Sequence, residues 1–325
     1  MAILLTGVAG FIGAACARRL LDRGEEVVGA DNLNDYYDVS LKEARLRTLS
    51  NAKGFRFERG DLTDRAYTSR LFESHRPKRV LHLAAQAGVR YSVTHPHAYT
   101  ASNVEAFLNI LEGCRHHGVE HLAFASSSSV YGSNRKLPFS VSDRVDHPVS
   151  LYAATKKAGE LMAHCYSHLY GTPITALRYF TAYGPWGRPD MAYFLFTRKI
   201  LAGEPIEIFN HGKHRRDFTY IDDVADISLK ALDQTATPQA PGEPAFRIYN
   251  LGNGNPVTLT DFLATLEELL GRKAERRLVD IQSGDVEETH ADITELTRDF
   301  GVRPRIALRD GLERFVRWYR EYYRG

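Results

Sequence analysis

The sequence predicts an α/β protein in which a doubly wound parallel sheet is followed by a smaller C-terminal α/β domain. Short apolar runs alternate with helical patterns over the first 180 residues. Such alternation is typical of parallel strands connected by right-handed helical crossovers. After residue 180 the pattern loosens into clusters of glycine, proline and aromatic residues, which indicates the second domain.

The expected strands are six apolar segments of strand length, each bounded by Gly, Asp or Ser. They cover residues 3–5, 27–30, 55–57, 80–84, 122–125 and 174–177. Between the first two segments, Ile12, Cys16 and Leu20 recur at a spacing of four residues. This spacing predicts a helix over 13–22 that stops at Gly24.

Fewer elements can be predicted in the second half of the chain. Thr260 is expected to cap a helix that runs to Leu270 and stops at Gly271. Residues 308–323 have the pattern of an amphipathic terminal helix, and three prolines in 234–244 predict a surface loop. We therefore divide the chain into a cofactor domain and a mainly substrate-binding domain, which cover residues 1–180, with return segments near 218–250, and residues 181–325.

The composition argues against several classes of function. Among 325 residues, 42 Lys and Arg oppose 40 Asp and Glu, and the formal net charge of +2 provides no field to attract nucleic acid or an anionic membrane. The hydrophobic fraction of 43% is that of a globular protein. No apolar run approaches the roughly 18 residues of a membrane span, and no targeting segment is expected at the first residues.

The cysteines and histidines give no metal or disulfide signature. Cys16, Cys114 and Cys165 lack the spacing of a disulfide framework or a zinc site, which favours a reducing cytoplasm. His164 and His168 are four residues apart, but no carboxylate motif accompanies them. We therefore expect no metal.

A glycine-rich turn follows the first strand and opens the first helix. Gly7, Gly10 and Gly13 have the spacing GxxGxxG, with Phe11 and Ile12 between the last two glycines. Glycines let a backbone approach a pyrophosphate, whose charge the amides and dipole of the helix N-terminus attract. A lone glycine triplet is also typical of an ordinary tight turn.

An acidic residue at the end of the second strand supports the cofactor interpretation. Asp31 stands about 20 residues after the glycine turn, where a Rossmann-type fold places its ribose-binding acid. A carboxylate accepts hydrogen bonds from ribose hydroxyls and repels a 2′-phosphate, which favours NAD over NADP. Further residues at strand ends would border adenine and ribose, although ordinary turns use the same residue types; they are Asp61, Leu62, Leu83, Ala84 and Ala85.

Tyr152 and Lys156 are the expected catalytic pair. They are four residues apart in a helix-compatible run and therefore share one face, whereas Lys157 points elsewhere. A cation beside a phenol favours the phenolate, which would lower the pKa of about 10 and let tyrosine act as a base. Such a pair also arises by chance on structural helices.

Several motifs together resemble the extended short-chain dehydrogenase/reductases over essentially the whole chain. The first are the glycine turn, the YxxxK pair and the run SSSSVYG at 126–132. Within that family the sequence is most similar to UDP-glucuronate 4-epimerases. That likeness rests on NLNDYY at 32–37, QAGVRYS at 86–92, GPWGRPDM at 184–191 and RRDFTYIDD at 215–223.

The resemblance implies roles for individual residues. Tyr152 would take the proton from the hydroxyl on sugar carbon 4, Lys156 would hold the phenolate and the nicotinamide ribose, and Ser127 would hydrogen-bond the same oxygen. Asn32 and Tyr179 would contact the cofactor. Tightly bound NAD would accept a hydride to give a 4-keto sugar and then return it to the opposite face.

Ser128 and Ser129 bear on which reaction follows. Related dehydratases carry Asp and Glu at these two positions, and related decarboxylases carry Glu at the second, so the hydroxyls here favour epimerisation. Serines also avoid repelling a glucuronate carboxylate and can donate to it. We expect Ser128, Ser129 and Thr181 to hold that carboxylate, although a serine run is also typical of turns.

Arginines and one loop complete the expected substrate site. Guanidinium groups match phosphate and carboxylate pairs, and the candidates are Arg188, Arg216 and, more weakly, Arg90. Gln282 and Asp285 resemble a family loop that closes near the nucleotide.

The sequence leaves two alternatives to a UDP-glucuronate 4-epimerase. It also predicts a homodimer. A 4-epimerase of neutral UDP-hexoses needs no carboxylate clamp, and a catalytically silent NAD-binding scaffold needs no catalytic residues. Related enzymes form dimers, so the helices around 101–115 and 152–170 are expected to pair across a two-fold axis in a homodimer.

Overall fold

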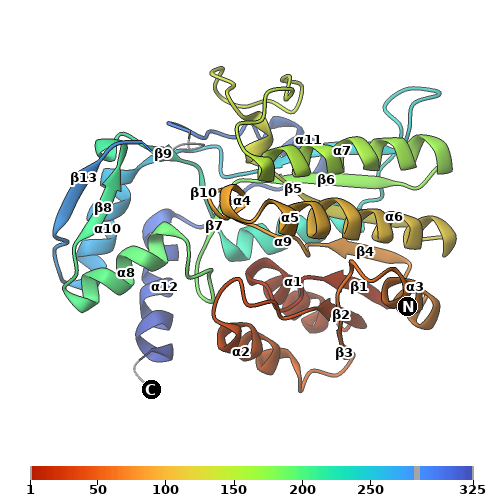
Figure 1. The fold of residues 1–325 in the computed structure, drawn as a ribbon, viewed down its shortest axis with the longest axis horizontal. Coiled ribbons are helices and arrows are strands. Elements are labelled where there is room, and N and C mark those ends of the chain that lie inside the picture. The colour runs from red at the N-terminus through yellow and green to blue at the C-terminus, as the bar shows by residue number, and fades with distance from the viewer. Residues whose placement is uncertain (1, 282–285, 324–325) are drawn as a thin grey trace.

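The computed structural model describes residues 2–281 and 286–323. Its largest element is a parallel sheet of seven strands, which confirms the predicted doubly wound α/β class (Figure 1). From one edge to the other the strands are β3 (Phe55–Arg59), β2 (Val27–Asp31), β1 (Ile3–Thr6), β4 (Arg79–His82), β5 (His121–Ser127), β6 (Ile174–Tyr179) and β11 (Phe246–Leu251).

The strand order reverses between β1 and β4. From β1 the chain proceeds outward through β2 and β3, then returns to β4 and proceeds in the other direction. Loops at the carboxyl ends of β1 and β4 therefore diverge and leave a crevice, which is where ligands bind in open α/β sheets. The edge strand β11 comes from late in the chain and pairs with β6.

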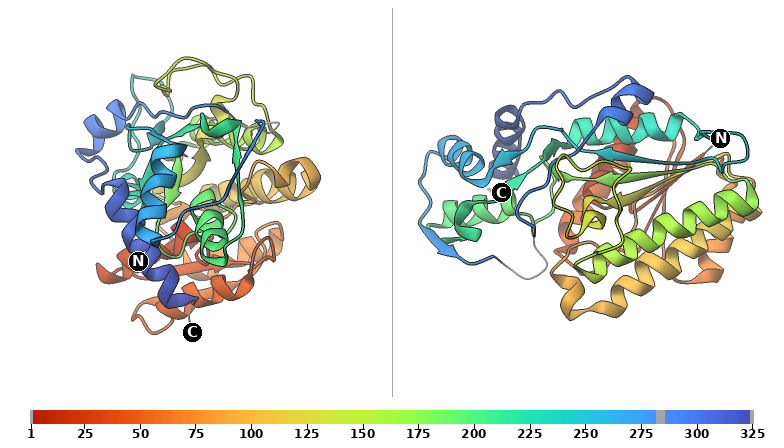
Figure 2. Two further views of the ribbon diagram at one scale, coloured as in Figure 1. Left: turned by 90° about the vertical axis from the view of Figure 1, so that its left-hand side faces the viewer. Right: turned by 90° about the horizontal axis from the view of Figure 1, so that it is seen from above.

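Helices cover both faces of the sheet (Figure 2). On one face α1 (Phe11–Asp22) packs against α2 (Val39–Leu49) and α9 (Ile221–Asp233). On the other, α6 (Ala106–His116) packs between α3 (Arg65–His75) and α7 (Leu151–Tyr170). Alternate residues of β1 serve the two faces, because Ile3 and Leu5 belong to one buried cluster and Leu4 to the other.

The remaining elements form a smaller lobe on the left of Figure 1. Its helices are α8 (Ala192–Ala202), α10 (Leu259–Leu270) and α12 (Leu308–Tyr322), whereas α11 (Thr294–Phe300) lies against β11 of the large sheet. Its strands form three pairs, which are β7 (Thr181–Tyr183) with β10 (Phe218–Tyr220), β8 (Ile206–Phe209) with β13 (Arg276–Val279), and β9 (Arg215–Arg216) with β12 (Val257–Thr258).

Two local predictions need correction. The cap of α10 is Thr258, whose hydroxyl accepts from the amide of Asp261 at 3.1 Å, rather than Thr260. The helix expected over 101–115 is interrupted: α4 (Tyr91–Thr94) and α5 (Pro96–Thr100) lead into a π-helical turn (Ala101–Glu105), and α6 starts at Ala106. No helix in the described ranges is both long enough and apolar enough to span a membrane.

Candidate active site

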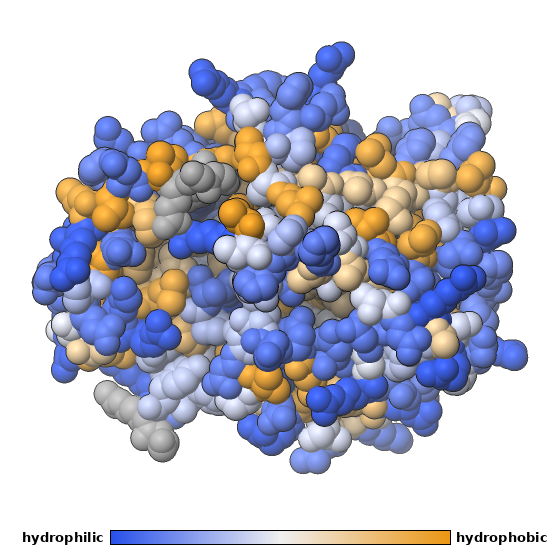
Figure 3. Space-filling model, viewed as in Figure 1, coloured by the Kyte–Doolittle hydropathy of each residue, from blue (hydrophilic) through white to orange (hydrophobic). Residues whose placement is uncertain are grey.

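A cavity of about 470 Å³ lies at the carboxyl ends of the sheet strands, where the strand order reverses. Figure 3 shows the surface hollowed between the smaller lobe and the body that carries the sheet. The cavity is lined by every residue that the sequence assigns to the cofactor: Gly7, Gly10, Phe11, Ile12, Gly13, Asp31, Asn32, Asp61, Leu62, Leu83, Ala84, Ala85, Tyr152, Lys156 and Tyr179.

The glycine turn has the shape that a dinucleotide pyrophosphate requires. Gly7 has a φ of 73°, and a Cβ there would lie 2.7 Å from the backbone nitrogen of Ala84, so a larger residue would not fit. A Cβ on Gly13 would overlap the carbonyl of Gly7. Because Gly10 precedes α1 without a side-chain cap, the first amides of the helix remain available to a phosphate.

Asp31 is oriented by the backbone around it. Its two carboxylate oxygens accept from the amides of Ala9 at 3.0 Å and Leu33 at 2.9 Å. Each oxygen retains acceptor capacity for a ribose hydroxyl, and the negative charge opposes a 2′-phosphate. The chain's own residues therefore fit NAD.

A second acid, Asp61, faces the same end of the cavity. Burial raises the pKa of Asp61, but hydrogen bonds from Thr63 and Asn32 outweigh it and hold the pKa below its ordinary value. The Asn32 amide donates to this carboxylate at 3.0 Å. An ionised acceptor is therefore available beside Asp31.

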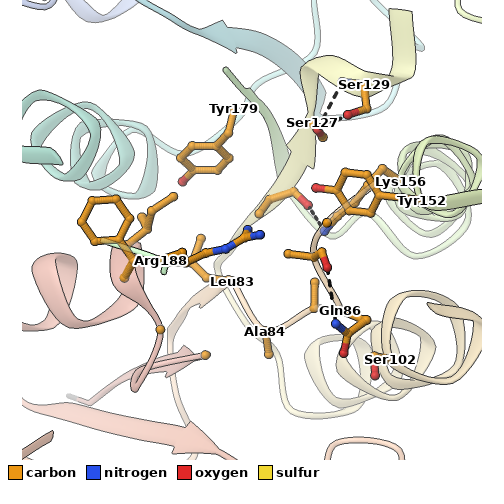
Figure 4. A pocket seen from close by; sticks show the side chains of 18 of the residues that line it. Leu83, Ala84, Gln86, Ser102, Ser127, Ser129, Tyr152, Lys156, Tyr179 and Arg188 are labelled. Carbon is orange, nitrogen blue, oxygen red and sulfur yellow. Dashed lines mark hydrogen bonds between the residues drawn. The ribbon is translucent and has the colours of Figure 1, made fainter. Parts of the chain in front are cut away.

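Tyr152 and Lys156 lie on the first turns of α7 and point into the cavity (Figure 4). Ser150 caps this helix, because its hydroxyl accepts from the amide of Ala153 at 3.1 Å. The Lys156 ammonium donates to the carbonyl of Ala125 on β5 at 2.8 Å. Burial lowers the pKa of Lys156 to about 8.

The electrostatics of Tyr152 differ from the sequence prediction. Burial holds the pKa of its phenol above the ordinary value, and the Ser127 hydroxyl and the Arg188 guanidinium offset this rise only in part. The Lys156 ammonium donates to the carbonyl of Ala125 rather than to the Tyr152 phenol. Arg188 is a cation that favours the phenolate in this structure.

The serine cluster follows β5 as a short 3-10 turn (Ser128–Tyr131). Ser127 donates to the Ser129 hydroxyl at 3.1 Å and accepts from the Ser129 amide at 3.2 Å. The neighbouring Ser126 instead donates to buried Glu160 at 2.7 Å. Ser127, Ser128, Ser129 and Thr181, the first residue of β7, all line the cavity.

Arg188 projects toward Tyr152 from the loop before α8, between Leu83 and Tyr179 in the view of Figure 4. Asp190 accepts from its Nε at 3.0 Å and from its terminal nitrogen at 2.5 Å. Tyr36 also donates to Asp190, at 3.0 Å. The guanidinium is therefore held in place by a carboxylate that is itself fixed.

Two other predicted residues line the cavity but already use their polar groups in hydrogen bonds within the protein. The hydroxyl of Tyr179 is bound to Ser228 at 2.7 Å, so this residue offers its ring. Arg216 lines the cavity and donates to the carbonyls of Arg215 and Glu287, both at 3.0 Å.

One predicted substrate residue does not line the cavity, and two others cannot be placed. Arg90 is exposed, and its guanidinium lies 5.0 Å from the ring centre of Phe209 on β8 instead of lining the cavity. Gln282 and Asp285 lie outside the described residues.

The structure adds residues that sequence reasoning missed. Lys42 lines the cavity, and its ammonium donates to the carbonyl and side-chain oxygens of Asn34, both at 2.6 Å. Gln86, Ser102 and Met191 also line it. The resemblance marked the segments that hold Asn34, Gln86 and Met191, but nothing in the sequence separates Lys42 from surface lysines. Within the described residues, no group of three or more His, Cys, Asp or Glu side chains is placed to hold a metal.

Comparisons with known proteins agree with this geometry. The model of the NAD dependent epimerase/dehydratase family matches residues 3–252. UDP-glucuronate 4-epimerase 3 of Arabidopsis thaliana is 50% identical, and the match covers 99% of this chain and 77% of that protein.

Solved structures extend the likeness to the whole fold. The structure of UDP-glucuronic acid 4-epimerase from Bacillus cereus in complex with UDP-glucuronic acid and NAD has a TM-score of 0.91 and 32% identity, covering 99% of this chain and 100% of the other. UDP-glucose 4-epimerase of Thermotoga maritima, with UDP-glucose, has a TM-score of 0.88 and 30% identity, with 99% of both chains covered. With its cavity, glycine turn and Tyr152–Lys156 pair, this chain belongs to the NAD dependent epimerase/dehydratase family.

Proposed function

We infer that this protein is an NAD-dependent enzyme that interconverts UDP-glucuronate and UDP-galacturonate by epimerisation at sugar carbon 4. The observation that carries this inference is the placement of three neutral hydroxyls, Ser128, Ser129 and Thr181, in one cavity with Tyr152 and Lys156. Relatives that act on UDP-glucuronate support the same substrate.

The chain's own residues supply the proton chemistry. The Tyr152 phenolate takes the proton of the carbon 4 hydroxyl, and the Ser127 hydroxyl orients that oxygen. Arg188 stabilises the negative charge of the phenolate, as its effect on the tyrosine pKa indicates. When bound, NAD supplies the hydride acceptor and donor at carbon 4.

The glycine turn and Asp31 hold the cofactor side of the site. The free amides at the start of α1 bind the pyrophosphate, and Asp31 binds the adenosine ribose. We assign this role to residues 1–180 with the return segments near 218–250, and substrate enclosure mainly to residues 181–325.

The hydroxyl clamp explains how an acidic sugar survives oxidation. A 4-keto glucuronate is a β-keto acid, which loses carbon dioxide when its carboxylate bond aligns with the carbonyl π system. Donors from Ser128, Ser129 and Thr181 hold the carboxylate out of that alignment without adding a competing negative charge.

The two other interpretations of the sequence make different predictions for one assay. Purified protein is supplied with UDP-glucuronate and UDP-glucose in parallel, and the sugar products are separated. Conversion of UDP-glucuronate to its 4-epimer, with UDP-glucose converted at least about tenfold more slowly, is the expected result. Faster conversion of UDP-glucose would favour the neutral-sugar epimerase, and no conversion of either would favour the silent scaffold.

The remaining expectations concern assembly and compartment. Leu108 on α6 and Leu161 and Leu169 on α7 are exposed apolar side chains, and the two helices pack against each other. Their burial against a second copy is the basis on which we propose a homodimer. Cys16, Cys114 and Cys165 are free thiols, which fits a reducing cytoplasm.

A further inference from the structure

Arg45 is a buried arginine outside the proposed catalytic set. It lies on α2, and only 1% of its surface is exposed. Within the described part of the chain, no carboxylate forms an ion pair with it. Burying a guanidinium among neutral groups is costly unless its donors are satisfied. The acceptors that these donors reach therefore indicate what Arg45 holds in place.

The donors of Arg45 join three segments that are far apart in the sequence. Its Nε and one terminal nitrogen donate to the carbonyl of Trp186, at 3.0 and 2.7 Å. The same nitrogen reaches the carbonyl of Gly187 at 3.2 Å. The other terminal nitrogen donates to the carbonyl of Ala9 at 3.0 Å and to the hydroxyl of Tyr37 at 2.6 Å.

The first of these segments is the backbone immediately before Arg188. Trp186 has a φ of 65°, in the left-handed region that non-glycine residues rarely adopt. Such a conformation persists only when its surroundings hold it. Here Arg45 binds the carbonyl of Trp186, and the indole packs 5.2 Å from the ring of Trp318 on α12.

The second segment belongs to the expected cofactor site, and the third is next to a residue that holds Asp190. Ala9 lies inside the glycine turn, and its amide donates to the ribose-binding Asp31. Tyr37 follows Tyr36, which donates to the Asp190 carboxylate that holds Arg188. Arg45 therefore contacts both the glycine turn, at Ala9, and the loop that carries Arg188, at Trp186 and Gly187.

We propose that Arg45 is a positioning residue, which fixes the Trp186–Gly187 backbone and thereby sets the direction in which the Arg188 guanidinium points toward the Tyr152 phenol. The inference rests on the proposed function, because its consequence is read at the catalytic tyrosine. It also accounts for the Tyr36–Tyr37 motif, in which one hydroxyl serves Asp190 and the other serves Arg45.

The test is a double-mutant cycle with Arg45→Lys and Arg188→Lys, measured as kcat and KM for UDP-glucuronate at saturating NAD. Lysine keeps the charge of Arg45 but cannot span three segments with one ammonium. Misplacing a substrate-orienting group by about 1 Å costs up to a hundredfold. We expect Arg45→Lys to lower kcat by about tenfold or more in the parent, and by less than about threefold in the Arg188→Lys background.

Three controls separate positioning from a loss of folding. Arg47 lies on the same helix, is exposed and pairs with Glu43 at 3.9 Å. The control variant Arg47→Lys should therefore change kcat by less than about twofold. Tyr37→Phe removes one acceptor of Arg45 and keeps the arginine. It should lower kcat by less than Arg45→Lys does, and its effect should likewise shrink in the Arg188→Lys background. Thermal melts and bound NAD are measured for every variant.

Tryptophan emission gives a readout that needs no turnover. The chain has two tryptophans, Trp186 and Trp318, and their rings pack against each other beside the backbone that Arg45 binds. We expect Arg45→Lys to shift their emission and Arg47→Lys to leave it unchanged.

Two outcomes would overturn the proposal. Equal losses from Arg45→Lys in both Arg188 backgrounds would show a general structural role, and unchanged kcat with unchanged emission would show no role at all. A parent that leaves UDP-glucuronate unchanged would contradict the proposed function instead, and the emission arm alone would then decide whether Arg45 holds the loop.

Discussion

Replacing Lys156 with methionine should stabilise the NAD-free protein even though it removes a residue of the active site. Burial lowers the pKa of Lys156 from 10.5 to about 8, which corresponds to about 3 kcal/mol at about 1.4 kcal/mol per pKa unit. The change also removes a charged donor to the Ala125 carbonyl, at a cost of about 2 kcal/mol. We expect a net gain of about 1 kcal/mol at pH 7, or about 2 °C in Tm.

The pH dependence of this gain has a defined sign. In the folded protein Lys156 loses its proton near pH 8, whereas in the unfolded chain it keeps the proton to about pH 10.5. The unfolded state binds more protons across that window, so parent stability from this group rises with pH between about 8 and 10.5. The advantage of Lys156→Met should therefore be largest below pH 8 and shrink as the pH rises.

Thermal denaturation of NAD-free protein at pH 7 and at pH 9.5 checks this reasoning. NAD must be removed first, because a ligand bound to the folded state raises Tm by itself. Lys157→Met is the matched control: this partly exposed lysine pairs at 3.4 Å with the buried Glu160 carboxylate, and its loss should give no stabilisation. A Lys156→Met protein that is less stable than the parent at pH 7, or whose advantage grows with pH, would refute the argument.

Three further predictions concern the reaction. Tyr152→Phe should retain bound NAD but lose at least about a hundredfold in kcat, because the hydroxyl moves the proton; turnover assays with NAD quantification check this, and an active variant would remove Tyr152 from the mechanism. Asp31 should make NAD bind more tightly than NADP in calorimetric titrations, and the reverse order would contradict its role. Ser128→Ala with Ser129→Ala, or Thr181→Ala, should bind UDP-glucuronate more weakly by about 1.5 to 3 kcal/mol per lost donor and release some UDP-4-keto-pentose with accumulated NADH; mass spectrometry showing only the epimer, with unchanged affinity, would place the carboxylate elsewhere.

Much of the fold was predictable from local sequence patterns. The alternation of apolar runs and helical spacing marked six strands of the large sheet, because buried parallel strands are nearly continuous apolar segments. The seventh strand, β11, was harder to predict. It reads FRIYNL, its first three residues are only partly buried, and it joins the sheet after a long excursion. The domain division expected a return to the sheet near 218–250, but no strand was named within that segment.

Predictability of the site depended on whether a residue acts through a local motif or a distant contact. Gly7, Asp31 and Tyr152 have short-range signatures, and all three line the cavity. Arg45 has none, because its backbone partners lie at the glycine turn and more than a hundred residues further along the chain. The environment of Lys156 was equally hidden, since its bond to Ala125 joins α7 to β5.

The fate of the hydrogen on sugar carbon 4 distinguishes epimerisation by hydride return from other routes. UDP-glucuronate carrying deuterium at that carbon is converted by the purified protein, and the product is examined by mass spectrometry and NMR. We expect UDP-galacturonate that keeps the deuterium at carbon 4, because the hydride leaves and returns within one closed site. Loss of the deuterium to water would contradict the account, as would a product other than the 4-epimer.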